Sequence, residues 1–220
     1  MITRILVILN VIAFLWEIKV AGPGMLGFAG GGNFDAVLQA GALSPASVIV
    51  GHEWWRIFTS AFLHEGLVHI VVNMISLWSL GRFIEYLAGS VRMTIIYVVS
   101  LVAAGLGVIY LSAPAAALTA TLGASGAIFG LFGALFAIGL KLGRPGMQLV
   151  RDNVGILILN LVITFAVPMI SWQAHVSGLV TGFVLTLLIF YPPRRVQPVV
   201  VDAATGDTYE TEYEAPHPAR

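Results

Sequence analysis

Six apolar stretches, each about as long as a bilayer is thick, constrain this chain more than any other feature of its sequence. A helix needs roughly 20 apolar residues to cross the hydrocarbon. A chain of 220 residues that is 58% hydrophobic and 10% charged cannot hide its apolar surface in a water-soluble core. The stretches are residues 3–21, 61–81, 92–112, 123–141, 153–171 and 174–192. We therefore expect an all-α polytopic membrane protein, with six transmembrane helices in residues 1–192.

The positions of the basic residues orient these helices. Six crossings place both termini on one side, and the ends grouped on that side carry most of the basic residues: Arg4, Arg82, Arg92, Lys141, Arg144, Arg151, Arg194 and Arg195. The opposite loops hold Lys19 and Arg56. The positive-inside rule then predicts that both termini are cytoplasmic.

The first stretch has an alternative interpretation as a signal peptide. Residues 5–16 have the length of a signal-peptide core, and Val20-Ala21-Gly22 is small enough to be cleaved. Glu17 and Lys19 favour a membrane helix instead, because charged residues suit the interfacial end of such a helix. The start of the chain does not resemble an organellar transit peptide, so we expect the plasma membrane of a prokaryote.

Two segments lie outside the apolar stretches. The loop 22–60 is Gly-rich at its start and ends in Trp54, Trp55 and Arg56, a combination typical of the lipid headgroup level. The segment 193–220 combines acidic residues with prolines. We expect it to be a disordered cytoplasmic tail, or at most a small hairpin at Thr205-Gly206.

Charge and cysteine content exclude several functions. The net charge is zero, with 11 Lys and Arg against 11 Asp and Glu, so no basic field for nucleic acid exists. The chain has no cysteine, which excludes thiol nucleophiles, disulfides and thiolate metal sites. A nucleophile in this chain is therefore an oxygen or a nitrogen.

A few polar residues lie inside the apolar stretches, where they are costly and therefore informative. The second stretch begins with His64, His69 and Asn73, the fourth with Ser125, and the sixth with His175. These three stretches run from outside to inside, so the five residues share one depth in the outer half of the membrane. His69 and Asn73 share a helical face, whereas His64 would be turned by about 140° from His69. We therefore expect His64 to belong to the loop or first turn, on a different surface.

Small residues allow the fourth and sixth helices to approach closely. Gly126 belongs to a small-residue stripe beside Ser125, and Gly178 and Gly182 continue the face of His175. If these faces meet, His175 comes within reach of Ser125.

Each feature also has an ordinary structural explanation. A serine in an apolar helix usually bonds the carbonyl four residues back, and an intramembrane histidine can be structural. We interpret Asn10 and Asn160 as interhelical hydrogen-bonding residues. The conjunction of a nucleophile, a base and two donors at one depth favours an active site.

The chemistry that this set supports is nucleophilic attack by a serine. His175 is the predicted base for Ser125. No carboxylate lies near it in its own stretch, so we predict a dyad whose imidazole is oriented by packing against Phe129. The predicted donors to an oxyanion are the Ser125 backbone N–H at a helix N-terminus, His69 and Asn73.

Hydrolysis also needs access for water. Gly123 and Gly126 have no side chains that could cover Ser125, so we expect them to leave space for water above it. A wet cavity open to the outside is expected, lined by polar residues around the mouth of the sixth stretch: Ser171, Gln173, Ser177 and Thr181. The uncharged segment 167–172 is the predicted lid.

These motifs resemble those of the rhomboid intramembrane serine proteases in their six-span bacterial form. The resemblance covers roughly residues 1–192 and rests on HEGLVHIVVN, GASGAIFG and AHVSGLVTG. Trp55 and Arg56 of the WWR motif support it, as does Glu85 within LGRFIEYLAGS.

The resemblance implies a role for each of these residues. Ser125 would be the nucleophile and His175 its base, His69 and Asn73 would join the Ser125 backbone at the oxyanion, and His64 would be structural. A tyrosine often stands in the family where this chain has Phe129, so stacking is retained and a hydroxyl is lost. The resemblance also implies transmembrane substrates, often single-pass, cut near the outer membrane edge, without a metal or organic cofactor.

Two other functions stay open. A catalytically inactive rhomboid-like protein would bind transmembrane clients, although Ser125, His175, His69 and Asn73 are all retained. A small transporter or metal site would use His64, His69 and His175, but the first two diverge by about 140° on a helix and no carboxylate joins them.

Overall fold

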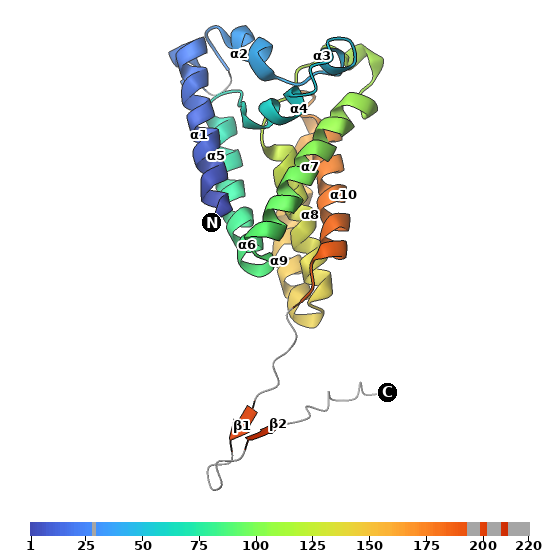
Figure 1. Ribbon diagram of the computed structural model, residues 1–220. Coiled ribbons are helices and arrows are strands. Elements are labelled where there is room, and N and C mark those ends of the chain that lie inside the picture. Colours follow the sequence, from blue (N-terminus) through green and yellow to red (C-terminus); the bar gives the residue numbers. More distant parts are fainter. Residues whose placement is uncertain (28–29, 193–198, 202–207, 211–220) are drawn as a thin grey trace. The chain divides into compact units, whose positions relative to one another are not determined.

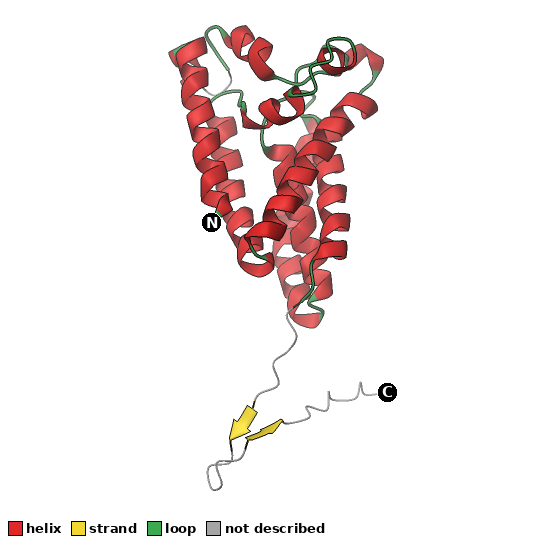
Figure 2. Ribbon diagram, viewed as in Figure 1, coloured by secondary structure: helices red, strands yellow, loops and turns green. Residues whose placement is uncertain are grey.

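The computed structural model describes residues 1–220 apart from 28–29, 193–198, 202–207 and 211–220. The chain divides into two compact units, Met1–Phe190 and Tyr191–Arg220. The first unit is a helical bundle, and Figure 2 shows its helices joined by loops. The expectation of an all-α membrane bundle is confirmed for this unit.

The first unit contains long helices and several short ones. In chain order they are α1 (Ile2–Ala21), η1 (Pro23–Leu26), α2 (Phe34–Gly41), α3 (Pro45–Ile49), α4 (Arg56–Thr59), η2 (Ser60–Phe62), α5 (Leu67–Ser76), the π-helical turn η3 (Leu77–Gly81), α6 (Arg82–Ala88), α7 (Ser90–Leu111), η4 (Pro114–Ala116), α8 (Ser125–Lys141), α9 (Arg144–Ala166) and α10 (Trp172–Ile189). Helices α2, α3 and α4 lie together at one end of the bundle, and α1 begins toward the other end (Figure 1).

Some of these helices are long and apolar enough to span a membrane. Among the described residues, four helical segments are long and apolar enough to cross a membrane: Leu67–Ala88, Ser90–Leu111, Gly146–Ala166 and Trp172–Ile189. Helix α8 is apolar but shorter, and α1 carries Arg4, Glu17 and Lys19. The count of six spans therefore stays a prediction.

The bounds of two helices differ from the expected ones. The second apolar stretch, 61–81, begins outside the helix, which starts at Leu67 after Gly66 adopts a φ of 115°. The fifth helix starts at Arg144 rather than 153 and ends at Ala166. The fifth helix starts early because backbone hydrogen bonding continues through polar residues that an apolar window leaves out. The second helix starts late because an apolar window also includes residues before the helix begins.

Helix α8 is the centre of the bundle and is buried along most of its length. Its backbone touches α10 at glycines. A methyl group on Gly178 would overlap the carbonyl oxygen of Gly126, and one on Gly182 would overlap that of Gly130. On its α7 side, a methyl group on Gly126 would lie 2.6 Å from the Cβ of Ala104. The small-residue faces predicted to meet are in backbone contact.

Helix α1 is fastened at its start by Glu85 of α6. This carboxylate accepts the N–H of Ile2 (2.7 Å), the N–H and hydroxyl of Thr3 (3.1 and 2.7 Å), and the Ser90 hydroxyl (2.6 Å). The first N–H groups of a helix have no partner within it. Glu85 therefore caps α1 and links it to α6 and α7.

Near the other end of α1, Glu17 is fully buried and its two carboxylate oxygens accept the backbone N–H of His64 (3.2 and 3.1 Å). Glu17 therefore has a partner within the protein, and its placement at the interfacial end of a membrane helix stays a prediction. A cleaved signal peptide would remove this contact and those of Thr3, so the packing favours a retained helix.

Asn10 and Asn160 do not link helices through their amide N–H groups. Each donates to the carbonyl four residues back, at 2.8 Å, Asn10 to Leu6 and Asn160 to Ile156. The interhelical interpretation is wrong for these donors, since the nearest acceptor belongs to the same helix.

In the second unit, β1 (Val199–Val201) and β2 (Thr208–Glu210) pair antiparallel, with Val200 opposite Tyr209. The predicted turn at Thr205-Gly206 lies outside the described residues, as does most of the segment 193–220 for which disorder was expected.

Replacing Gly178 tests the contact between α8 and α10. We expect Gly178→Ala to lower the free energy of unfolding by about 1–3 kcal/mol, because its methyl group meets a backbone carbonyl that cannot move aside alone. Gly155→Ala on α9 is the matched control, since nothing lies within 4 Å of the added methyl group. Thermal unfolding in detergent checks both variants, and equal midpoints would contradict the contact.

Candidate active site

Ser125 is the first residue of α8, and the chain before it is tethered to the loop between α1 and α5. Thr121 and Leu43 exchange backbone hydrogen bonds (2.7 and 3.0 Å), and the N–H of Gly123 donates to the Ser60 carbonyl (2.8 Å). Gly123 has a φ of 116°, which favours glycine. At the start of the helix, the Ser125 N–H has no carbonyl four residues back within it, and the helix dipole adds partial positive charge there.

His175 lies in the first turns of α10, facing Ser125. Its Nε2 atom is 2.7 Å from Ser125 Oγ, and the histidine is 7% exposed. The structure thus brings together the predicted nucleophile and the predicted base from helices whose backbones touch. A hydroxyl within hydrogen-bond reach of an imidazole is the geometry of a serine activated by a general base.

Two side chains hold the imidazole of His175. The ring of Phe129 stacks on it, with centroids 4.1 Å apart and planes 14° from parallel. Thr164 of α9 places Oγ1 2.7 Å from His175 Nδ1. The expectation that packing alone orients the ring is therefore wrong.

The sequence analysis missed Thr164. It is a polar residue near the outer end of the fifth apolar stretch, so its depth is visible in the sequence. A threonine in a helix usually bonds its own backbone, however, and therefore gives no signal of a tertiary partner.

His69 presents an N–H group toward the serine. Its Nδ1 accepts the backbone N–H of Glu65 (3.3 Å), so the neutral ring carries its proton on Nε2. A methyl group on Gly123 would lie 2.9 Å from His69 Nε2 and 3.8 Å from Ser125 Oγ. The imidazole N–H and the serine hydroxyl therefore border the same small space beside Gly123.

Asn73 lies one turn after His69 on α5 and is 5% exposed. Its Nδ2 donates one N–H to the His69 carbonyl at 3.0 Å. An amide nitrogen has two N–H groups, so this bond fixes the side chain while a second donor is left for the site.

His64 lies in the loop between η2 and α5 and is fully buried. Its Nδ1 is 3.2 Å from the Phe62 carbonyl, and its ring lies edge-on to that of His69, with centroids 5.1 Å apart. The expected position in the loop or first turn is confirmed, but the expected separation from the surface of His69 is wrong, because the two rings are in contact. Among the described residues, no group of three or more His, Cys, Asp or Glu is placed to hold a metal ion.

Other residues expected around the site have packing or capping roles. Gly126 packs against α7 rather than forming part of the wall above the serine. Ser171 accepts the Ala174 N–H (3.3 Å) and caps α10, and Ser177 packs against Gly107 of α7. The segment 167–171 joins α9 to α10, and its role as a lid stays a prediction.

The comparison with known families agrees with this arrangement. A model of the rhomboid domain matches residues 51–192, more than half of the chain. The chain belongs to the rhomboid family. Together with its apolar helices, this membership makes it an integral, multi-pass membrane protein.

Curated relatives of this rhomboid differ in length and in activity. It is 31% identical over 160 residues to rhomboid protease GluP of Bacillus subtilis (strain 168), covering 72% of this chain and 31% of the relative. It is 32% identical over 167 residues to RHOMBOID-like protein 6, mitochondrial, of Arabidopsis thaliana, covering 74% and 53%. A third relative, inactive RHOMBOID-like protein 8 of Arabidopsis thaliana, is 37% identical over 70 residues, covering 32% and 20%. This rhomboid spans about a third to a half of the length of the first two.

The loop between α1 and α5 of this rhomboid carries two half-exposed tryptophans. Trp54 and Trp55 are 46% and 47% exposed, as expected for residues at a membrane interface. Arg56 lies over the Trp55 ring, with its guanidinium carbon 4.7 Å from the centroid. The Arg56 side chain is buried against protein, and the placement of this loop at headgroup level stays a prediction.

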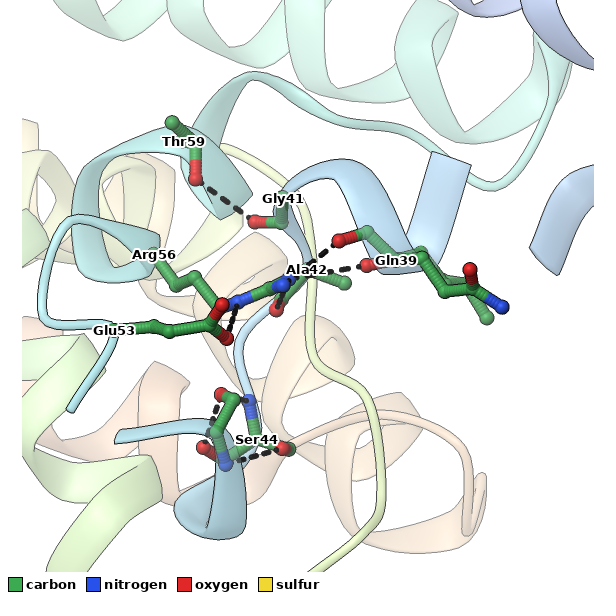
Figure 3. A network of polar contacts seen from close by, with 9 residues as sticks. Gln39, Gly41, Ala42, Ser44, Glu53, Arg56 and Thr59 are labelled. Carbon is green, nitrogen blue, oxygen red and sulfur yellow. Dashed lines mark hydrogen bonds and ion pairs between the residues drawn. The ribbon is translucent and has the colours of Figure 1, made fainter. Parts of the chain in front are cut away.

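Arg56 instead closes the end of α2 (Figure 3). Its Nη1 donates to the carbonyls of Leu38 (3.2 Å) and Ala42 (2.9 Å), its Nη2 donates to that of Gln39 (2.7 Å), and its Nε bonds the Glu53 carboxylate. The last carbonyls of a helix lack intrahelical donors and carry partial negative charge. The guanidinium thus fixes the loop that holds Leu43 against the segment before the serine.

A lysine cannot replace this guanidinium. We expect Arg56→Lys to lower the free energy of unfolding by about 2 kcal/mol, because one ammonium cannot reach three carbonyls and a carboxylate in a planar fork. Arg82→Lys is the matched control, since Arg82 also lies over a tryptophan ring, Trp78, at 4.9 Å. Thermal unfolding in detergent compares the two variants; a loss as large in Arg82→Lys would contradict the role of the carbonyl contacts.

Proposed function

We propose that this rhomboid is an intramembrane serine endopeptidase that hydrolyses peptide bonds in or near transmembrane segments of other membrane proteins. The observation that carries the proposal is the 2.7 Å contact between His175 Nε2 and Ser125 Oγ. It lies beside the N–H donors of His69 and of the α8 N-terminus.

The proposed reaction begins with acylation of Ser125. As Oγ attacks the carbonyl carbon of the scissile bond, its proton passes to His175 Nε2. The tetrahedral intermediate collapses when His175 returns this proton to the leaving amine. The C–N bond breaks and an acyl ester remains on Ser125.

Three donors are proposed to stabilise the oxygen that becomes negative in this step. They are the Ser125 backbone N–H, the His69 Nε2–H and the second amide N–H of Asn73. Such donors are most effective where water is excluded and their positions are fixed in advance. The hydrogen bonds from Glu65 to His69 and from Asn73 to the His69 carbonyl support that fixed placement.

Water completes the cycle. His175 takes a proton from a water molecule as its oxygen attacks the ester carbonyl, and then returns the proton to Ser125 Oγ. The acid is released and the serine is regenerated. The chain's own residues suffice for these steps, so the proposal includes no metal or organic cofactor.

The proposed substrates are transmembrane proteins, single-pass ones above all. We place the termini in the cytoplasm and the site toward the outer side of a prokaryotic plasma membrane, on the distribution of basic residues.

Covalent labelling tests the assembled dyad without a known substrate. We expect a fluorophosphonate probe to label the detergent-purified protein, and Ser125→Ala and His175→Ala each to abolish labelling, because the probe reacts with an activated serine. Circular dichroism and thermal unfolding establish that the variants are folded. Full labelling of either variant would refute the dyad.

A second candidate is an inactive rhomboid that binds transmembrane clients, since one relative carries the name inactive. It predicts a folded wild-type protein that the probe does not label even after long incubation. The retained Ser125–His175 contact favours the protease.

Asn73→Ala tests the oxyanion donors. We expect it to lower kcat on a transmembrane reporter by about 10²–10³-fold with little change in KM, because the donor acts mainly in the transition state. Asn153→Ala is the matched control, since Asn153 also donates to the carbonyl four residues back (Leu149, 2.9 Å) but lies on α9. A change confined to KM would remove Asn73 from the oxyanion role.

A further inference from the structure

Thr164 is the point at which α9 reaches the candidate dyad. It is 2% exposed, whereas its neighbours Ile163 and Phe165 are 43% and 62% exposed. Helix α9 otherwise buries little of its membrane-spanning surface. The Thr164 hydroxyl thus points inward from an exposed helix and contacts the edge of the His175 ring. The reaction described above gives it no role.

The hydrogen bonds of Thr164 determine which way its proton points. Its Oγ1 donates to the Asn160 carbonyl at 2.7 Å. A hydroxyl has one proton and two lone pairs, and a carbonyl cannot donate in return. The oxygen therefore faces His175 Nδ1, 2.7 Å away, as an acceptor.

An acceptor at Nδ1 selects one tautomer of the neutral imidazole. The proton lies on Nδ1, and Nε2 is left with a lone pair directed at Ser125 Oγ, 2.7 Å away. This is the tautomer in which His175 can receive the serine proton. In the other tautomer, Nε2–H would donate to the serine oxygen and could not act as its base.

We propose that Thr164 is a positioning residue that holds His175 in its base-competent tautomer and orientation. This inference rests on the proposed function and deepens it. Phe129 cannot perform this task, because a ring stacked on the face of the imidazole fixes its plane without distinguishing the two nitrogens. A contact at the ring edge distinguishes them.

The same contact persists through the proton transfers. When His175 accepts the proton of Ser125, both ring nitrogens carry hydrogen, and Nδ1–H remains bonded to Thr164 Oγ1. When Nε2 returns the proton, the ring relaxes to the starting tautomer. The threonine gains and loses no proton in the cycle, so its effect is on orientation and tautomer alone.

Nuclear magnetic resonance of the wild-type protein tests the tautomer directly. The protein is labelled with ¹³C and ¹⁵N at histidine, and the signals of His175 are those missing from His175→Ala. We expect the shifts of a neutral ring protonated at Nδ1, above the pH at which the ring titrates. Shifts of the Nε2-protonated ring in the wild type would overturn the proposal without any variant of Thr164.

Variants at position 164 test the consequence for reactivity. We expect Thr164→Val to slow fluorophosphonate labelling and to lower kcat at least about tenfold with KM nearly unchanged, because one neutral hydrogen bond to the base is lost at constant shape. Its His175 signals should shift toward the Nε2-protonated ring. Thr164→Ser, which keeps the hydroxyl, should restore most of both rates.

Thr94→Val is the matched control, since Thr94 also donates to the carbonyl four residues back (Ser90, 2.8 Å) but is a half-buried residue of α7. It should label at the wild-type rate. If Thr164→Val keeps the wild-type labelling rate and tautomer, Thr164 has no positioning role. If it fails to fold, the wild-type tautomer and the Thr164→Ser rates still decide the question.

These outcomes separate the inference from the proposed function. A folded wild-type protein that is never labelled refutes the protease, and the tautomer of its His175 still supports or overturns the role of Thr164. A wild type that is labelled, alongside an equally reactive Thr164→Val, leaves the protease standing and removes the threonine.

Discussion

The backbone contact between α8 and α10 determines whether a serine on one helix can meet a histidine on the other. Lipid supplies no hydrophobic force between helices, so close packing and polar contacts must hold them. Gly178 and Gly182 allow that packing because each lies against a carbonyl oxygen of α8. Ser125 and His175 lie within a turn of the contact between Gly126 and Gly178, so the close approach of the two backbones brings the two side chains to 2.7 Å.

The two sides of the site are supported by different kinds of interaction. The serine end depends on backbone hydrogen bonds to the loop before α5, at Leu43 and Ser60, and the loop in turn depends on the buried guanidinium of Arg56. The histidine end depends on side chains of neighbouring helices, the Phe129 ring and the Thr164 hydroxyl. Disturbing the loop should therefore move Ser125, the proposed nucleophile, whereas disturbing α9 should affect His175, the proposed base.

The sequence predicted the parts of this arrangement that follow from periodicity and depth. Helical spacing placed Phe129 over the face of the imidazole, and small residues indicated that two helices meet. The helical angle separated His64 from His69 although their rings are in contact, because such an angle does not apply to a loop residue. The partners of Arg56 and Glu17 were not predicted, because hydropathy does not register the buried backbone carbonyls and N–H groups that bond these charged side chains. Thr164 was missed because its partner comes from another helix.

The absence of a carboxylate beside His175 in its own stretch has a physical reason in a membrane protein. A buried carboxylate costs several kcal/mol in desolvation unless it is fully paired, and that cost is higher where lipid replaces water. A threonine oxygen whose proton is committed to its own helix accepts Nδ1–H without any charge. His69 follows the same principle, since a backbone N–H from Glu65 determines its tautomer. On the proposed role of Thr164, uncharged neighbours direct the protons of both imidazoles.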